Sequence, residues 1–244
     1  MKKLIAIFAV LASLSLAVSP VATAQTNVDI DAVADSVSNA DVDTLLNDLQ
    51  TPPADDQLPD GFSDAEYANP DTATSEQGVI PSADIGDATG SIAYTMEWEP
   101  SAMASPETGM AGTPAAANGG FAIRQATLNY IFVDEEITSD DLDDFKSGAE
   151  QGLMSQASPE SGTETNIETI QVEGTDAILL TYTLNDQGIQ SVVKMVALPV
   201  GNTMVISMLV EASNEVNQDA VETSAQDLVL SGTGYLGDVA ENGQ

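Results

Sequence analysis

Apolar and polar residues alternate along two stretches of the chain, 91–99 and 121–134, and this period of two is typical of β-strands. The first stretch has a single apolar face, which predicts a half-buried strand. The second is apolar on both faces near its end, so it is expected to be covered on both sides. The faces expected to point into the core are Ile92, Tyr94, Met96 and Trp98 on the first strand, and Ala126, Leu128, Tyr130 and Phe132 on the second.

Four more strand-like runs follow in quick succession. Short links rich in Gly, Asn, Asp or Pro separate them, which predicts antiparallel neighbours. The runs cover residues 167–173, 177–184, 189–198 and 203–210.

Apolar residues recur with helical spacing in three other segments. Residues 25–50 predict one or two short helices, whose acidic polar face would leave them either docked or fluctuating. Residues 138–157 predict a helix with early acidic residues that suit its positive end. A last helix is expected to begin near Ser213 and to end at Gly232, a residue type that closes helices, which leaves 233–244 as a flexible tail.

The order of these elements predicts an α+β domain, in which helices pack on an antiparallel sheet. We place this domain at residues 59–232, after an acidic helical or disordered segment and linker at 25–58. Residues 51–90 have loop composition. Residues 100–120 are a low-complexity insertion that favours disorder.

The first 24 residues have the three parts of a secretory signal peptide. Lys2 and Lys3 are followed by an apolar stretch at 4–17, and Ala22-Thr23-Ala24 is a small-x-small cleavage site. A membrane anchor is the alternative, but the stretch is shorter than the ~20 residues that a span needs. We therefore expect an exported protein, periplasmic or extracellular, with no membrane span.

Charge and composition exclude several functions. The chain has 39 acidic residues, 5 cationic ones and a formal net charge of −34, which repels nucleic acid and anionic membranes. Without the leader, the remaining cations are Arg124, Lys146 and Lys194. Solubility or salt adaptation is the favoured explanation of the acidity, and binding of cations or of a basic partner is the alternative.

The chain contains no Cys and no His, which removes the usual ligands of zinc, copper, haem and iron–sulfur clusters. A Ser-His-Asp or Cys-His nucleophile is also excluded. We therefore assign no catalytic residue, no metal site and no cofactor.

The arrangement from about residue 59 to 232 resembles the PsbP-like superfamily, which includes exported bacterial proteins of the DcrB and LpqN kind. The resemblance implies an α/β/α sandwich around an antiparallel sheet and a mostly non-enzymatic role through protein partners. No functional residue carries over. The acidity is the reverse of the basic docking surface of PsbP, and the 100–120 insertion is a departure. The features that carry the resemblance are Gly61-Phe62, Asn69-Pro70, the 94–98 strand, the 138–157 helix, residues 172–178 and the closing helix to Gly232.

Two short motifs suggest chemistry that their context disfavours. Gly232 to Gly237 matches G-x-G-x-x-G, but it follows a helix rather than a strand, so a helix end and tail are favoured over a dinucleotide site. Ser191 and Lys194 match S-x-x-K, but a strand points them to opposite faces, so Lys194 is expected to face outward.

Acidic residues suggest two further sites. Glu97 and Glu99 share one strand face at a separation that suits a glycosidase pair, although a solvated face is favoured. No segment fits a calcium loop. The candidates for a weak calcium site are Asp140, Asp141, Asp143 and Asp144, and the loop Asp84 to Asp87.

Methionines in the later strands suggest either core filling, which is favoured, or a promiscuous binding surface; they are Met195, Met204 and Met208.

Three functions follow. The leading hypothesis is an exported, non-enzymatic protein that binds a protein partner or a small ligand. The alternatives are an exported hydrolase that uses carboxylates and an envelope protein that binds calcium or other divalent cations weakly.

Overall fold

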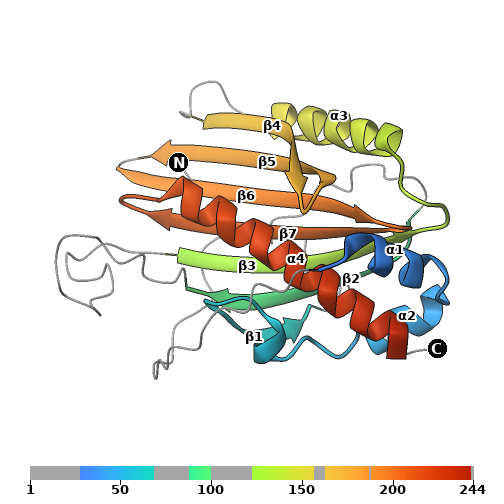
Figure 1. Ribbon diagram of the computed structural model, residues 1–244. Helices are drawn as coiled ribbons and strands as arrows, with labels where there is room; N and C mark the ends of the chain where they lie inside the picture. Colours follow the sequence, from blue (N-terminus) through green and yellow to red (C-terminus); the bar gives the residue numbers. More distant parts are fainter. Residues whose placement is uncertain (1–27, 69–87, 100–122, 157–162, 187, 243–244) are drawn as a thin grey trace.

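The computed structural model describes residues 28–68, 88–99, 123–156, 163–186 and 188–242 (Figure 1). The signal-peptide prediction and the predicted 100–120 insertion lie outside these residues. Within these described residues, seven strands form one antiparallel sheet in the order β1-β2-β3-β7-β6-β5-β4, as the α+β prediction required. The elements are α1 (Ile30–Ser38), α2 (Val42–Asp48), the 3-10 turn η1 (Asp55–Gln57), β1 (Phe62–Tyr67), β2 (Ala88–Trp98), β3 (Ile123–Val133), α3 (Ser139–Gln156), β4 (Thr163–Val172), β5 (Thr175–Asp186), β6 (Ile189–Val200), β7 (Thr203–Ser213) and α4 (Gln218–Asn242).

Helices lie on both faces of the sheet, so the core has two parts. On one face, α4 crosses the sheet with α1 and α2 beside its last turns (Figure 1). The apolar faces of β2 and β3 point into this larger part, as the alternation predicted. On the other face, α3 buries Phe145 and Ala149 against residues such as Ile178 and Met204. Thr138 caps α3 through a bond from the Asp141 N–H to its hydroxyl, at 3.4 Å.

The two N-terminal helices are docked, which decides between the alternatives that the sequence left open. Val37 of α1 and Leu45 of α2 are buried in the same core as the sheet. Asp29 caps α1 by accepting from the Ala32 N–H, and Asp41 caps α2 by accepting from Thr44. The segment expected to precede the domain therefore contributes to its core.

Strand β1 lies within residues 51–90, which were predicted to be loop, so that prediction was wrong at this point. Phe62 is the fully buried residue of this short strand, Ala65 and Tyr67 are partly buried against the core, and the register shift between Ser63 and Glu66 interrupts the alternation. Alternation is therefore hard to recognise in the sequence. Pairing with β2 holds the strand in place, and Phe62 stacks on Trp98 with ring centroids 6.2 Å apart.

The last helix does not end at Gly232, as was predicted; α4 continues to Asn242. Residues expected to be a flexible tail are buried there, including Tyr235, Leu236 and Ala240. Gly232 and Gly237 are interior helix residues at positions where β3 and α1 approach the helix closely. Close packing has overridden the usual preference of glycine for helix ends.

Candidate functional site

The glutamate pair at the end of β2 lies on an exposed surface. Glu97 and Glu99 are both exposed and alternate with buried Trp98, and the Glu99 N–H donates to the Gly61 carbonyl of the β1 flank at 2.7 Å. The two side chains share a face, as predicted. A catalytic pair needs a cleft that desolvates one carboxyl group, and these two carboxylates are solvated instead.

The residues of the S-x-x-K motif point away from each other, as strand geometry predicted. Lys194 is nevertheless not an outward residue, so that expectation was wrong. It is 6% exposed and lies under α4, where its Nζ is 2.7 Å from Oε2 of Glu222. The ammonium group is therefore used in an ion pair between β6 and α4. A second ion pair joins two strands: Nη2 of Arg124 in β3 is 3.4 Å from Oε1 of Glu211 in β7.

The acidic residues at the start of α3 do not converge on one point. Asp140, Asp143 and Asp144 are exposed. Asp141 accepts from both the backbone N–H and the hydroxyl of Thr138, each at 2.7 Å, and these bonds lower the pKa of its carboxyl group. In the described part of the chain, no three acidic residues are placed to hold a metal ion. The loop Asp84 to Asp87 lies outside the described residues.

The methionines mainly fill the core. Met195 and Met204 are buried beneath α3, and Met208 is half-buried beside them. This agrees with the favoured explanation and leaves little methionine surface for promiscuous binding.

The glycine-rich motif serves packing between elements. A β-carbon on Gly232 would lie 2.6 Å from Cδ1 of Leu128 in β3, and one on Gly237 would lie 2.8 Å from Cγ2 of Val33 in α1. The motif opens no helix and follows no strand, so its backbone N–H groups are not presented to a phosphate. The dinucleotide interpretation is therefore excluded by its position inside α4.

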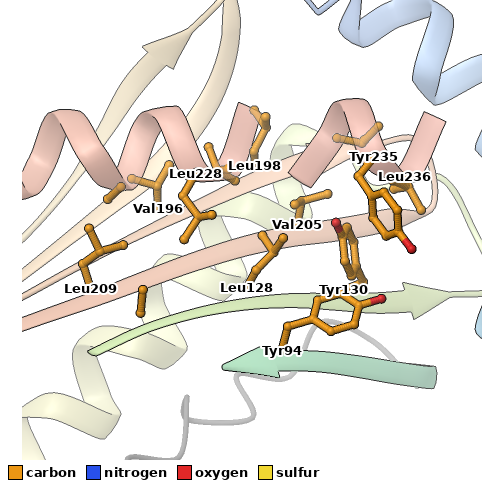
Figure 2. Close-up of a cluster of buried hydrophobic side chains, with 14 of the residues drawn as sticks. Tyr94, Leu128, Tyr130, Val196, Leu198, Val205, Leu209, Leu228, Tyr235 and Leu236 are labelled. Carbon is orange, nitrogen blue, oxygen red and sulfur yellow. The ribbon is translucent and has the colours of Figure 1, made fainter. Parts of the chain in front are cut away.

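Three tyrosines meet inside the larger core (Figure 2). The ring of Tyr94 makes edge-on contacts with Tyr130 and Tyr235, with centroids 6.0 and 6.5 Å apart. Tyr130 donates to the Gly232 carbonyl at 2.8 Å. Tyr94 and Tyr235 donate to the carbonyls of Leu49 and Thr51, which follow α2. The hydroxyls therefore join β2, β3, α4 and the chain after α2.

Burial is the main cause that raises the pKa of Tyr94, Tyr130 and Tyr235. Each hydroxyl thus stays protonated and acts as a donor, which suits a structural role. Alternation in the sequence had placed Tyr94 and Tyr130 in the core. Tyr235 was missed because it lies beyond the predicted helix end, although helical spacing from Leu228 was a usable signal.

Two hollows among the described residues are open to solvent. One, of about 300 Å³, lies between the start of α1 and the β4–β5 turn. The other, of about 360 Å³, lies between α2, η1 and the end of α4. Their acidic side chains, among them Asp31, Glu173 and Asp238, are exposed. Neither hollow contains a desolvated charged group that would mark a reaction site.

Part of the sheet on the α3 side has no helix over it among the described elements (Figure 1). We call this surface the open face. Its side chains stand directly opposite one another on β2 and β3, for example Ala93 with Asn129 and Thr95 with Thr127. They are polar or small, and Thr95 is exposed. The open face consists of Ser91, Ala93, Thr95 and Glu97 on β2, and Gln125, Thr127 and Asn129 on β3.

The sheet also has two edges, which differ. β1 has 6 residues, its register with β2 shifts between Ser63 and Glu66, and Asp64 has a positive φ of 54°. β4 has 10 residues and pairs with β5 in unbroken register. The described part of the chain is thus an α+β protein in which part of one sheet face and the two sheet edges have no described helix or strand over them.

Comparisons with known proteins add no family. No family model matches the chain, and no curated protein matches it. A solved structure of the Pseudomonas aeruginosa protein PA94, of unknown function, shares 15% identity with a TM-score of 0.24, covering 37% of this chain and 67% of that one.

LpqN of Mycobacterium tuberculosis, involved in cell envelope biogenesis, shares 14% identity with a TM-score of 0.30, covering 73% of this chain and 78% of its own. LpqN is one of the kinds of protein named above for the resemblance of the sequence. Both TM-scores are too low to support an inference about this chain. In the described residues, no helix has the length and apolar character needed to cross a membrane.

Proposed function

We propose that this chain is an exported, non-enzymatic binding protein that engages a protein partner through exposed parts of its sheet. One observation carries the proposal: Lys194 and the three core tyrosines, which are described side chains that could perform chemistry, are held by structural partners. Lys194 pairs with Glu222, and the tyrosine hydroxyls donate to backbone carbonyls. The open face, in contrast, presents side chains that can form new hydrogen bonds. Membership of the PsbP-like superfamily is part of this proposal.

The partner can be tested by site-specific photocrosslinking in the producing cells. A photoreactive residue replaces Thr95 on the open face, Thr169 on β4 or Thr223 on the outer side of α4, all of which are exposed. We expect one reproducible adduct from the sheet positions and none from position 223. Equal adducts from all three positions, or none from the sheet, would contradict binding through the sheet.

The hydrolase alternative is tested on the purified protein. Glu97→Gln and Glu99→Gln remove the only carboxylate pair that the sequence suggested for catalysis. We expect no glycosidase activity in the parent protein and none in the variants. A hydrolytic activity that survives purification and disappears in either variant would make the hydrolase the leading function.

A further inference from the structure

We propose that the outer edge of β4 accepts an extended, basic segment of a protein partner as an added strand. The inference rests on the proposed function and names the kind of partner. It starts from the sheet order, in which β4 is terminal and has β5 as its one neighbour among the described strands. Every second backbone N–H and C=O group of an edge strand points away from its neighbour and can pair with another chain.

The two edges of the sheet differ in how they are protected against such pairing. Natural proteins protect edge strands by making them short or by adding bulges. β1 has both features, since it has 6 residues, an irregular register and a positive φ at Asp64. β4 has neither, because it forms ten consecutive register pairs with β5 and contains no proline. The β4 edge is therefore geometrically ready for strand addition.

Charge determines which segment fits this edge. Glu164, Asn166 and Glu168 project from one face of β4 and are exposed, with Asn166 donating to Glu168 at 2.9 Å. An added strand would place its own alternate residues beside them. Lysine or arginine at positions four apart would face the two glutamates. Opposite charges across strands are favourable, and like charges directly opposite are unfavourable.

A second copy of this chain does not meet that requirement. Its cations beyond the predicted leader are Arg124, Lys146 and Lys194, which are too far apart in sequence to share one strand. Arg124 and Lys194 are also engaged with Glu211 and Glu222. A second β4 would set carboxylates against a strand that carries no cation. The same glutamates therefore oppose self-association and favour a basic partner.

The test uses ¹⁵N-labelled protein and a synthetic peptide of alternating Lys and Thr, as long as β4. We expect amide shifts confined to β4 and its neighbour, and slower hydrogen exchange at residues 164–171. Two control peptides distinguish binding through backbone pairing from binding through charge attraction alone. One has Glu in place of Lys, and the other keeps Lys but carries methyl groups on its backbone nitrogens. Neither control should bind.

Matched variants assign the site. Glu164→Gln with Glu168→Gln should weaken binding about fivefold, since two cross-strand charge pairs are lost. Glu135→Gln with Glu136→Gln removes the same charge from exposed positions between β3 and α3 and should change the affinity by less than about twofold, because those residues lie outside the β4 edge and the open face. Equal weakening by both double variants, or undiminished binding of the methylated peptide, would overturn the inference.

The outcomes also separate this inference from the proposed function. If the peptide fails at β4 while the crosslinker at Thr95 still captures a partner, strand addition is wrong and the binding function stands. If the peptide binds at β4 but no sheet position captures a partner in cells, the edge is competent and the proposed function fails.

Discussion

Gly232 of α4 lies directly against Leu128 of β3, so closely that a β-carbon on the glycine would be 2.6 Å from Cδ1 of the leucine. Leu128 is fully buried, so its side chain could move away only by displacing other atoms of a closely packed core. Glycine is therefore required here in the middle of a helix, where it would ordinarily be unfavourable. The contact sets how closely α4 approaches the sheet.

We expect Gly232→Ala to lower the free energy of unfolding by about 1 to 2 kcal/mol, because the strain of an overpacked core exceeds the gain in helix propensity. Gly234→Ala is the matched control in the same helix, since its β-carbon would come no closer than 3.5 Å to Val28. That control should be neutral or slightly stabilising. Urea unfolding measures both, and a Gly232→Ala protein as stable as the control would refute the contact.

The two partners of the ion pair between β6 and α4 differ in burial, so we expect their replacements to differ in cost. The side chain of Lys194 is 7% exposed and that of Glu222 is 32% exposed, so water relieves the glutamate more than the lysine. Glu222→Gln leaves a buried ammonium group without its carboxylate and should cost about 1 to 2 kcal/mol. Lys194→Met keeps the volume and removes the charge, so it should cost less. Denaturant unfolding of both variants tests this order, and the reverse order would contradict it.

The tyrosine cluster predicts a loss of stability at alkaline pH. In the unfolded chain the tyrosines titrate near pH 10, whereas burial raises their pKa in the folded protein. Above about pH 10 the unfolded state releases these protons and the folded state retains them, so the free energy of unfolding falls as the pH rises. Each tyrosine that stays neutral in the folded protein lowers the free energy of unfolding by up to about 1.4 kcal/mol for each pH unit above about 10.

Tyr130→Phe isolates this effect, because it keeps the ring and removes the hydroxyl. The variant should lose about 1 kcal/mol near pH 7, where its bond to the Gly232 carbonyl is missing, and should show a shallower decline between about pH 9 and 11. Urea titrations across that range provide the measurement. A parent protein and a variant with parallel pH curves would show that Tyr130 does not titrate on unfolding.

Salt and calcium distinguish a solubilising acidic surface from a cation site. The net charge of −34 means that the acidic side chains repel one another, so the melting temperature should rise as sodium chloride screens their charges. Calcium chloride at matched ionic strength should raise it equally. A rise specific to micromolar calcium would instead indicate native-state binding and favour the cation-binding alternative.

The sequence predicted the parts of the fold that depend on local pattern. Alternation identified the faces of β2 and β3 correctly, down to Tyr94 and Tyr130, because one side of each strand is buried. The meander from β4 to β7 followed from its short links. Strand β1 was missed because its pairing with β2 comes from tertiary contacts, and because its register shift between Ser63 and Glu66 interrupts the alternation of core-facing residues.

Features that depend on distant neighbours could not be predicted in the same way. Glycines in the motif at Gly232 look like helix ends until Leu128 and Val33 are known to lie beside them. Lys194 resembles an exposed strand residue until α4 places Glu222 above it. The terminal position of β4 among the described strands follows from their spatial order, which alternation in the sequence does not contain. The candidate binding surfaces could therefore not be predicted from the sequence. The sequence did show that the catalytic motifs were weak.

The contact between Val33 of α1 and Gly237 of α4 has a consequence for the order in which the protein can be made. The first helix of the described chain must wait for α4, because α4 is synthesised only after all the described strands. A chain emerging N-terminus first from a ribosome would hold α1 and α2 without their partner until α4 had emerged. Completion of the native core therefore depends on α4, and a product truncated before this helix would expose Val37 and Leu45 to proteases.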